Sequence, residues 1–295
     1  MSHRKQFGRL FRRVLPVLAL GAACASVSLA DIASQLGAAG GYAVLGLTGS
    51  TDQLSSGGLV INGNIGVGPG ATAALSSGVV NGSFFENSSG EVTQSGGETV
   101  PVIVQSMTAA QQAAISLANF AANAANSPTQ TFTSITSAIT ITGNGGENVI
   151  DVTGSQGIHL SGGTLTISGG PNDFFIIDVS GSQGMQLSGN TNIVLQGVAA
   201  NQVLWYFPGS ANNIVQTSGQ SDTEGIFLAP NGGIQINGGT HDSEFIAGGP
   251  LSFQSNPKVT PPPVIPEPGS LSMWLAGAAC FGAVLRRRAR AARVS

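Results

Sequence analysis

The feature that most constrains the fold is an internal repeat. Residues 150–162, with the sequence IDVTGSQGIHLSG, return as IDVSGSQGMQLSG at residues 177–189, an offset of 27 residues. Self-similarity at such a period is typical of repeat proteins, in which one unit cannot bury its apolar face alone and must stack on a neighbour. We therefore predict that each copy forms one rung of a β-solenoid.

Apolar residues inside the repeat alternate with polar ones, as in strands that bury one face. Ile158 and Leu160 of the first copy correspond to Met185 and Leu187 of the second. The 43 glycines and the wealth of Ser, Thr, Asn, Val and Ile favour strands joined by tight turns. The sequence predicts an all-β fold, a single β-solenoid over residues 31–255. Further rungs are predicted in four segments: 59–67, 79–85, 225–236 and 245–253.

One segment has a helical pattern instead. Residues 108–125 are rich in Ala, and their apolar residues recur at helical spacing, with Thr108 as a candidate N-cap and Ser127-Pro128 as a stop. We predict one amphipathic α-helix flanking the solenoid, whose apolar stripe serves for packing rather than for binding a partner.

Prolines then mark the end of the predicted body. Residues 256–266 contain Pro257 and the run Pro261-Pro262-Pro263. Proline-rich segments adopt extended, semi-rigid conformations. We therefore expect a stiff spacer here.

The N-terminal residues have the order of a secretory signal peptide. Five basic residues precede an apolar stretch at residues 14–27, which leads into the small-x-small site Ser28-Leu29-Ala30. We predict a signal helix within residues 1–30 and cleavage by signal peptidase between Ala30 and Asp31. Cys24 leaves a lipoprotein signal as an alternative, although Leu20 lies one place too far upstream for a good lipobox.

The C-terminal residues contain a second export signature. The tripeptide Pro266-Glu267-Pro268 precedes an apolar stretch, residues 271–285, and a basic tail, residues 286–293, that starts with Arg286, Arg287 and Arg288. Basic residues beside an apolar segment stay on the cytoplasmic side, which predicts a transmembrane helix with the body outside. In this order the three features resemble the PEP-CTERM sorting signal, residues 266–295. The resemblance implies cleavage by an exosortase, a transient inner-membrane anchor, and delivery to the cell surface or the extracellular space. A plain tail anchor is the alternative.

Composition excludes several functions for the predicted body. Between Asp31 and Pro266 there are 13 Asp and Glu against the single Lys258, a formal charge of −12. A body with this charge and no Arg cannot replace the counterions of phosphates, which excludes nucleic acid as a partner. Both cysteines, Cys24 and Cys280, fall in the terminal segments, so the body has no disulfide, thiolate metal site or cysteine nucleophile.

Five short motifs of the body form a recognisable series. They are YAVLG (42–46), INGNIGV (61–67), LANF (117–120), VLWYFP (203–208) and GIFLAPN (225–231). In this order they resemble the choice-of-anchor A domain of bacterial surface proteins, and they are also similar to the ice-binding family of β-solenoids with a flanking helix. The resemblance spans residues 38–253 and implies a surface protein without a catalytic signature.

Metal and acid–base sites receive little support from the pattern. His159 and His241 are the only histidines of the body. Asp242 next to His241 would point to the opposite side of a strand, so this pair is poorly arranged for one set of metal ligands. We expect both histidines in surface turns. Residues 143–151 are faintly similar to calcium-binding nonapeptide repeats. We expect no cofactor, and weak calcium binding by Asp151, Asp173 and Asp178 stays open.

Two further side-chain groups were weighed as binding or catalytic sites. Four acids late in the chain could in principle supply paired carboxylates for glycoside chemistry, but we expect them on exposed loops. Threonines in Thr-x-Thr pairs could supply an ice-binding face, but they do not recur at a fixed rung position. The acids are Asp222, Glu224, Asp242 and Glu244, and the threonines are Thr131, Thr133, Thr140, Thr142, Thr164 and Thr166.

Together these features predict an exported, exosortase-processed protein of the cell surface or extracellular matrix with a structural or adhesive role. We expect no enzyme activity, and extracellular polysaccharide or other surface proteins as partners. The alternatives are a protein that binds ice or carbohydrate and, third, an enzyme acting on polysaccharide.

Overall fold

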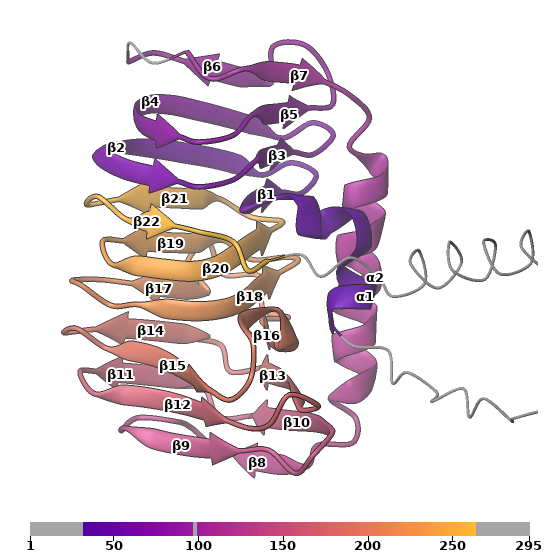
Figure 1. Ribbon diagram of the computed structural model, residues 1–295, viewed down its shortest axis with the longest axis vertical. Coiled ribbons are helices and arrows are strands. Elements are labelled where there is room, and N and C mark those ends of the chain that lie inside the picture. The colour runs from indigo at the N-terminus through magenta and orange to yellow at the C-terminus, as the bar shows by residue number, and fades with distance from the viewer. Residues whose placement is uncertain (1–31, 97–98, 264–295) are drawn as a thin grey trace, which may run out of the picture.

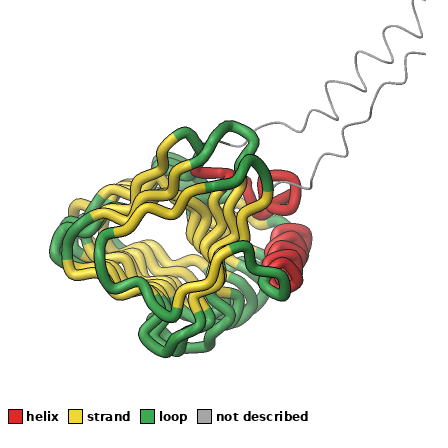
Figure 2. The backbone as a smooth tube through the Cα atoms, turned by 90° about the horizontal axis from the view of Figure 1, so that it is seen from below, coloured by secondary structure: helices red, strands yellow, loops and turns green. Residues whose placement is uncertain are grey.

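The computed structural model describes residues 32–96 and 99–263 as a β-solenoid of triangular cross-section with one long helix along its side (Figures 1 and 2). Residues 1–31 and 264–295, and with them the predicted signal peptide and sorting signal, lie outside the described residues. Among the described helices, none is long and apolar enough to cross a membrane. In chain order the elements are α1 (Ile32–Leu36), η1 (Gly37–Gly41), β1 (Val44–Gly46), β2 (Thr51–Ile61), β3 (Ile65–Val67), β4 (Thr72–Val80), β5 (Phe84–Glu86), β6 (Val92–Gln94), β7 (Val102–Val104), α2 (Thr108–Ala124), β8 (Gln130–Phe132), β9 (Ile139–Thr142), β10 (Glu147–Val152), β11 (Ile158–Ser161), β12 (Thr164–Ser168), β13 (Phe174–Val179), β14 (Met185–Ser188), β15 (Asn192–Gln196), η2 (Ala200–Gln202), β16 (Val203–Tyr206), β17 (Val215–Thr217), β18 (Thr223–Ala229), β19 (Ile234–Asn237), β20 (Thr240–Ala247), β21 (Leu251–Gln254) and β22 (Lys258–Val259).

Parallel strands form three faces, and every described strand pairing is parallel. The helix face consists of β7, β5, β3, β1, the second halves of β20 and β18, β16, β13, β10 and β8. The glutamine face consists of β6, the first halves of β4 and β2, β21, β19, β17, β14 and β11. The acidic face consists of the ends of β4 and β2, β22, the starts of β20 and β18, β15, β12 and β9.

The rungs do not stack in sequence order. The chain enters the solenoid in the middle at β1 and climbs to β7, after which α2 returns along the helix face to the other end (Figure 1). From β8 the chain climbs again until β20, β21 and β22 lie against β1 and β2. We call this junction the seam. It joins two stretches of chain that are about 200 residues apart in sequence, as in the hydrogen bond from Ser56 to Asn256.

The two copies of the repeat stack as predicted. β10 pairs with β13 and β11 with β14, in a register that places Ile158 beside Met185 and Leu160 beside Leu187. All four of these side chains are buried. The stacking follows from the pattern, because each apolar row covers the row of the next rung.

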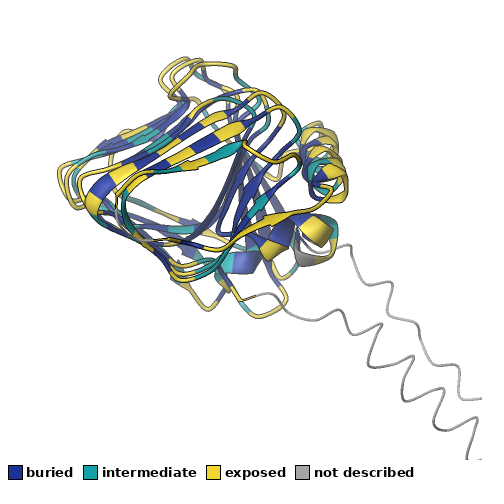
Figure 3. Cartoon of the chain, turned by 90° about the horizontal axis from the view of Figure 1, so that it is seen from above, coloured by how far each residue is buried: buried dark blue, intermediate teal, exposed yellow. Residues whose placement is uncertain are grey.

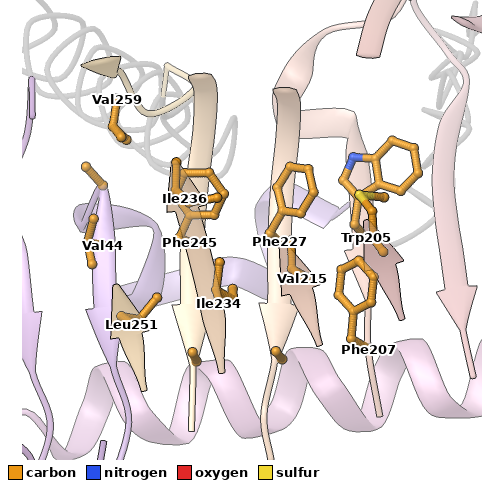
Figure 4. Packing of buried hydrophobic residues seen from close by; sticks show 14 of the residues in the cluster. Val44, Trp205, Phe207, Val215, Phe227, Ile234, Ile236, Phe245, Leu251 and Val259 are labelled. Carbon is orange, nitrogen blue, oxygen red and sulfur yellow. The ribbon is translucent and has the colours of Figure 1, made fainter. Parts of the chain in front are cut away.

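Aliphatic and aromatic side chains fill the interior. Buried residues alternate with exposed ones along many of the strands (Figure 3). On the helix face an inward column carries Trp205, Phe227 and Phe245, with ring centroids 5.8 and 5.3 Å apart along the column (Figure 4). Such offset and tilted ring contacts add to the stabilisation that burial provides. Gly225 is required beside this column, because its φ of 119° is left-handed and a Cβ would lie 2.8 Å from the Trp205 Nε1 atom.

Helix α2 packs on the helix face, as predicted for residues 108–125. Its buried residues are small, except Leu117, which lets the helix approach the outward apolar side chains of the strands. Ile115 points away and is 45% exposed. The N-cap residue is Met107 rather than the predicted Thr108, and no side chain caps the helix; the Ser106 hydroxyl accepts a hydrogen bond from the Thr108 N–H.

The described part of the predicted spacer belongs to the solenoid. Lys258 and Val259 form β22, which pairs with β2 and β20, and Val259 is fully buried. The Asn256 side chain accepts hydrogen bonds from the Ser56 hydroxyl and the Gly58 N–H. Residues 256–263 of the predicted stiff spacer thus pack on the solenoid, because the apolar Val259 completes the last rung, and residues 264–266 lie outside the described residues.

Candidate binding surface

Two of the three faces are exposed. On the helix face, α1, η1 and α2 cover outward apolar side chains such as Leu204, Ile226 and Leu228. Among the described residues no helix covers the glutamine face or the acidic face (Figure 3). Their outward side chains are mostly polar, with Val79 and Val194 as apolar ones on the acidic face. A macromolecule or an extended surface would therefore meet one of these two faces.

A ladder of amides runs along the glutamine face. In register, the outward column reads Gln53, Ser252, Gln235, Gln216 and Gln186 on five successive strands. Neighbouring strands lie about 4.8 Å apart, so the amides of Gln235, Gln216 and Gln186 repeat at that interval, and Gln53 lies two strands beyond Gln235. We call these five residues the glutamine ladder.

The amides of the ladder are free to bind. Gln53 is exposed, and Gln186, Gln216 and Gln235 are half-buried against their neighbours. Within the described residues none of these four side chains hydrogen-bonds to the protein. An amide offers one acceptor oxygen and two N–H donors, so the ladder can both donate to and accept from a hydroxyl-rich surface. The next residue of the column is His159, exposed as predicted, but on β11 rather than in a turn.

Three of the four predicted acids line the acidic face. Asp222, Glu224 and Asp242 point outward from the starts of β18 and β20, in strands or next to them rather than on loops. Asp222 accepts a hydrogen bond from the Thr240 N–H at 2.7 Å, and Glu224 accepts one from the Leu195 N–H at 3.2 Å. Partial burial raises the pKa of Glu224, the Leu195 hydrogen bond opposes the rise, and the charges of Asp242 and Asp222 add to it.

The fourth acid, Glu244, contradicts the prediction of an exposed loop. It is only 2% exposed and lies on the side of the helix face, next to Ile226 in register. Together with Asn201 and Leu36 it lines a cavity of about 20 Å³, closed by Pro262 and Pro263. The Glu244 Oε1 atom has no hydrogen-bond partner, and burial raises the pKa of this carboxyl. Because Glu244 lies on another face, the four acids do not form one catalytic group.

The aspartates of the candidate calcium site are separated. Asp173 accepts hydrogen bonds from the N–H groups of Gly145, Gly146 and Gly170, which lower its pKa and occupy its oxygens. Asp178 follows Asp173 by five residues, which in an extended strand separates the two aspartates by about 16 Å. It stacks in register on Asp151; burial and then the charge of Asp151 raise its pKa to about 6. Within the described residues, no group of three or more His, Cys, Asp and Glu could hold a metal ion.

His241 is not in a surface turn, which corrects the prediction. Its ring is fully buried in the core, where Nδ1 lies 2.9 Å from the Thr223 hydroxyl and Nε2 lies 2.7 Å from the Gly238 carbonyl oxygen. The ring also packs edge-on against Phe245. Burial lowers the pKa of His241 to about 4, with the Gly238 contact opposing the shift. A neutral imidazole with both nitrogens occupied is a structural element and not a ligand.

Hydroxyl groups form a small patch at the lower end of the acidic face. Thr140 lies beside Thr166 in register, and Thr142 lies beside Ser168. The column ends at Val194 on the next strand. Thr131 lies on the helix face, so it does not join this patch.

A groove of about 340 Å³ lies where α2 meets the strands of the helix face. Its walls include Leu47, Gln111, Ile115, Asn119 and Tyr206. Burial raises the pKa of Tyr206, and the charge of Asp178 adds to the rise. No sequence signal marks this groove, because it depends on where the returning helix crosses the rungs.

The sequence itself places the protein in a family. Residues 29–252 match the family model described as "Putative Ice-binding-like adhesive domain". The chain belongs to this family. Among curated proteins, none matches the sequence significantly.

Solved structures show the same fold for this ice-binding-like adhesive domain. An ice-binding protein from an Antarctic bacterium of the Flavobacteriaceae has 22% identity and a TM-score of 0.56 over 77% of this chain, which spans about half (47%) of that protein. The antifreeze protein LeIBP from Arctic yeast has 15% identity and a TM-score of 0.56, over 80% of this chain and 96% of its own. The DUF3494 domain of Shewanella frigidimarina ice-binding protein 1 has 19% identity and a TM-score of 0.54, and the match covers 80% of this chain and 98% of that domain.

Proposed function

We propose that the protein is an exported adhesive module that binds neutral polysaccharide through the glutamine ladder. The observation that carries this proposal is the column with four amides that have no hydrogen-bond partner among the described residues, on an exposed, regular face. The family description, an adhesive domain, agrees with such a role. Other surface proteins are the alternative partners for the same face.

The chemistry of the ladder suits a glycan chain. Two levels of the ladder span about 9.6 Å, close to the length of a disaccharide unit in an extended polysaccharide. Amides exchange hydrogen bonds with sugar hydroxyls in both directions. The formal charge of −12 on the body would repel acidic glycans, which favours neutral ones.

Export and surface delivery complete the proposal. The signal peptide ending at Ala30, the tripeptide Pro266-Glu267-Pro268 and the basic cluster from Arg286 to Arg288 support passage through signal peptidase and an exosortase. The inner membrane would hold the precursor transiently, with the body outside. The distribution of the four late acids over two faces speaks against the third reading, an enzyme with paired carboxylates.

Sedimentation with insoluble neutral polysaccharides tests the proposal. The triple variant Gln186→Ala, Gln216→Ala, Gln235→Ala should lose most of the binding, because it removes three adjacent levels of the ladder. The matched control Thr140→Ala, Thr240→Ala, Asp242→Ala changes three exposed residues of the acidic face and should bind as the native protein does. Equal retention of both variants would remove the ladder as the binding surface.

A second candidate function is ice binding, favoured by the hydroxyl patch of Thr140, Thr142, Thr166 and Ser168. Their in-register rows on β9 and β12 place hydroxyl side chains on neighbouring strands, with Thr140 and Thr142 exposed and Thr166 9% exposed. Thermal hysteresis of the native protein, lost when exposed Thr140 and Thr142 are replaced by Lys, would support it. Absence of hysteresis would leave the adhesive role alone.

A further inference from the structure

Both ends of the solenoid expose unpaired strand edges. At the upper end of Figure 1, among the residues that the structure describes, β7 pairs only with β5 and β6 only with β4. At the lower end, β8 pairs only with β10 and β9 only with β12 among the described strands. An unpaired edge presents free N–H and C=O groups that can continue the sheet with another chain.

The upper edge is also apolar. The three residues of β7 are exposed, Val102 by 40%, Ile103 by 41% and Val104 by 57%. Val102 and Val104 belong to the inward columns of the helix face, where every lower level is covered by the rung above. They are exposed because no rung covers them.

Three of the four edge strands, β7, β8 and β9, lack the charges that usually protect a sheet edge, whereas β6 directly follows Glu91. From Thr99 to Gly146 the sequence contains no Asp, Glu, Lys, Arg or His. This stretch includes β7, α2, β8 and β9, and hence strands of both ends. Natural proteins commonly protect exposed edges with Lys or with other charged residues, and this body concentrates its charge elsewhere.

The seam shows how such ends can join. There the upper edge of the rungs formed by β20, β21 and β22 meets the lower edge of β1 and β2, with no chain connection between them at that point. The pairing is parallel and in register, and side chains lock it, as in the hydrogen bond of 3.0 Å from the Asn62 side-chain amide to the Thr260 hydroxyl. One upper edge on one lower edge is therefore a packing that this fold already contains.

We propose that copies of this chain stack head to tail, the upper edge of one on the lower edge of the next. Because all strands of the helix face run in one direction, β8 of one copy would continue the parallel ladder above β7 of its neighbour. In that register Phe132, which is half-buried, lies over Val104, and Gln130 lies over Val102. The inference goes beyond the proposed function, since it does not use the glutamine ladder.

The proposed contact continues along the axis of the solenoid and therefore does not close into a ring. A heterologous contact repeated by translation along one axis gives an open filament. The helix face contains ten described strands, β7, β5, β3, β1, β20, β18, β16, β13, β10 and β8. At about 4.8 Å per strand each copy would add about 48 Å, which predicts the axial repeat of the filament.

Blocking each end separately tests the proposal with the full chain kept soluble in mild detergent. The upper block is Ile103→Lys with Val104→Lys, and the lower block is Thr131→Lys with Thr133→Lys. The control, Thr51→Lys with Thr240→Lys, places two lysines at exposed positions in the middle of the solenoid. Sedimentation velocity follows the mass, circular dichroism confirms that each variant is folded, and electron microscopy measures the repeat.

The native chain and the control should grow several-fold in mass with concentration and show the repeat of about 48 Å. Each blocked variant should remain a monomer, and an equimolar mixture of the two should form a dimer, since one intact upper edge then meets one intact lower edge. A native chain that stays monomeric at millimolar concentration would refute the proposal. So would a lower-blocked variant that dimerises alone, because its contact would then be upper edge on upper edge. Polysaccharide is absent throughout, so the result is independent of glycan binding.

Discussion

A carboxyl group inside the seam should make the stability of this protein depend on pH. Asp52 points inward from β2, opposite Leu251 of β21, and is fully buried. Neither of its oxygens makes a hydrogen bond of standard geometry. Burial raises the pKa of Asp52 to about 8, and the nearby Ser50 hydroxyl and Leu251 N–H oppose part of the rise.

The sign and size of the effect follow from this pKa. Below pH 3.8, the ordinary pKa of the group, the carboxyl is protonated in both folded and unfolded chains and costs nothing. Between pH 3.8 and about 8 only the folded state holds the proton, so the free energy of unfolding falls as the pH rises. At 1.36 kcal/mol per pH unit, Asp52 alone should remove about 3 kcal/mol between pH 5 and pH 7.

Denaturant unfolding from pH 5 to pH 7.5 measures the effect in the native protein and in Asp52→Asn, whose amide does not titrate. The variant should lose about 1.4 kcal/mol less stability per pH unit than the native protein. Glu244 and Asp178, whose pKa values burial also raises, contribute equally to both proteins and cancel in the difference. Asp242→Asn, at an exposed position of β20, is the control. Parallel stability curves for the native protein and Asp52→Asn would show that the folded state does not hold this proton.

Three further predictions concern the rungs, the seam and the tail. Leu160→Asp should unfold the protein in circular dichroism melts, because a carboxylate would replace a fully buried side chain, whereas Ser161→Asp at the exposed neighbour should melt as the native protein does. Asn256→Gly should lower the free energy of unfolding by about 1–3 kcal/mol through loss of the contacts to Ser56 and Gly58; Asn256→Ala should lose up to about 1–2 kcal/mol more, because φ at this residue is 64°. In the producing cells, the Glu267→Ala variant should accumulate as a membrane-bound precursor that retains Arg286, Arg287 and Arg288. Mass spectrometry of the C-terminus detects these residues, and their presence in released native protein would contradict the sorting hypothesis.

Local patterns were enough to predict the two rungs of the repeat. The alternation in residues 158–160 and 185–187 specifies which side chains face inward, and the offset of 27 residues specifies their stacking. The order of the rungs could not be predicted, because β1 pairs with β20 through contacts that no local pattern encodes. The apolar character of Val259 between prolines was the one available signal for β22.

For the side chains of the candidate site, too, the sequence predicts some features, and others depend on contacts between distant segments. Alternation along β20 places His241 inward and Asp242 outward, yet the sequence alone does not reveal which of two neighbours faces the core. Glu244 is buried by α1, η1 and the segment at Pro262, which meet it from both ends of the described chain. The glutamine ladder escaped notice because Gln53, Gln186, Gln216 and Gln235 are spaced irregularly in sequence and align only through the parallel register.

The late, short strand β22 has a mechanical consequence for a domain held by its C-terminal side. Tension applied through Pro263 would first load the hydrogen bonds from the Asn201 amide to the Pro263 carbonyl and from the Thr260 N–H to the His241 carbonyl. It would then reach β22, whose pairing with β2 and β20 closes the seam, and after it the contacts of Asn256 with Ser56, before it loads the long ladders of the helix face. The weakest point under load would thus be the junction between the two halves of the stack, so that shear would separate intact blocks of rungs and leave each aromatic column whole.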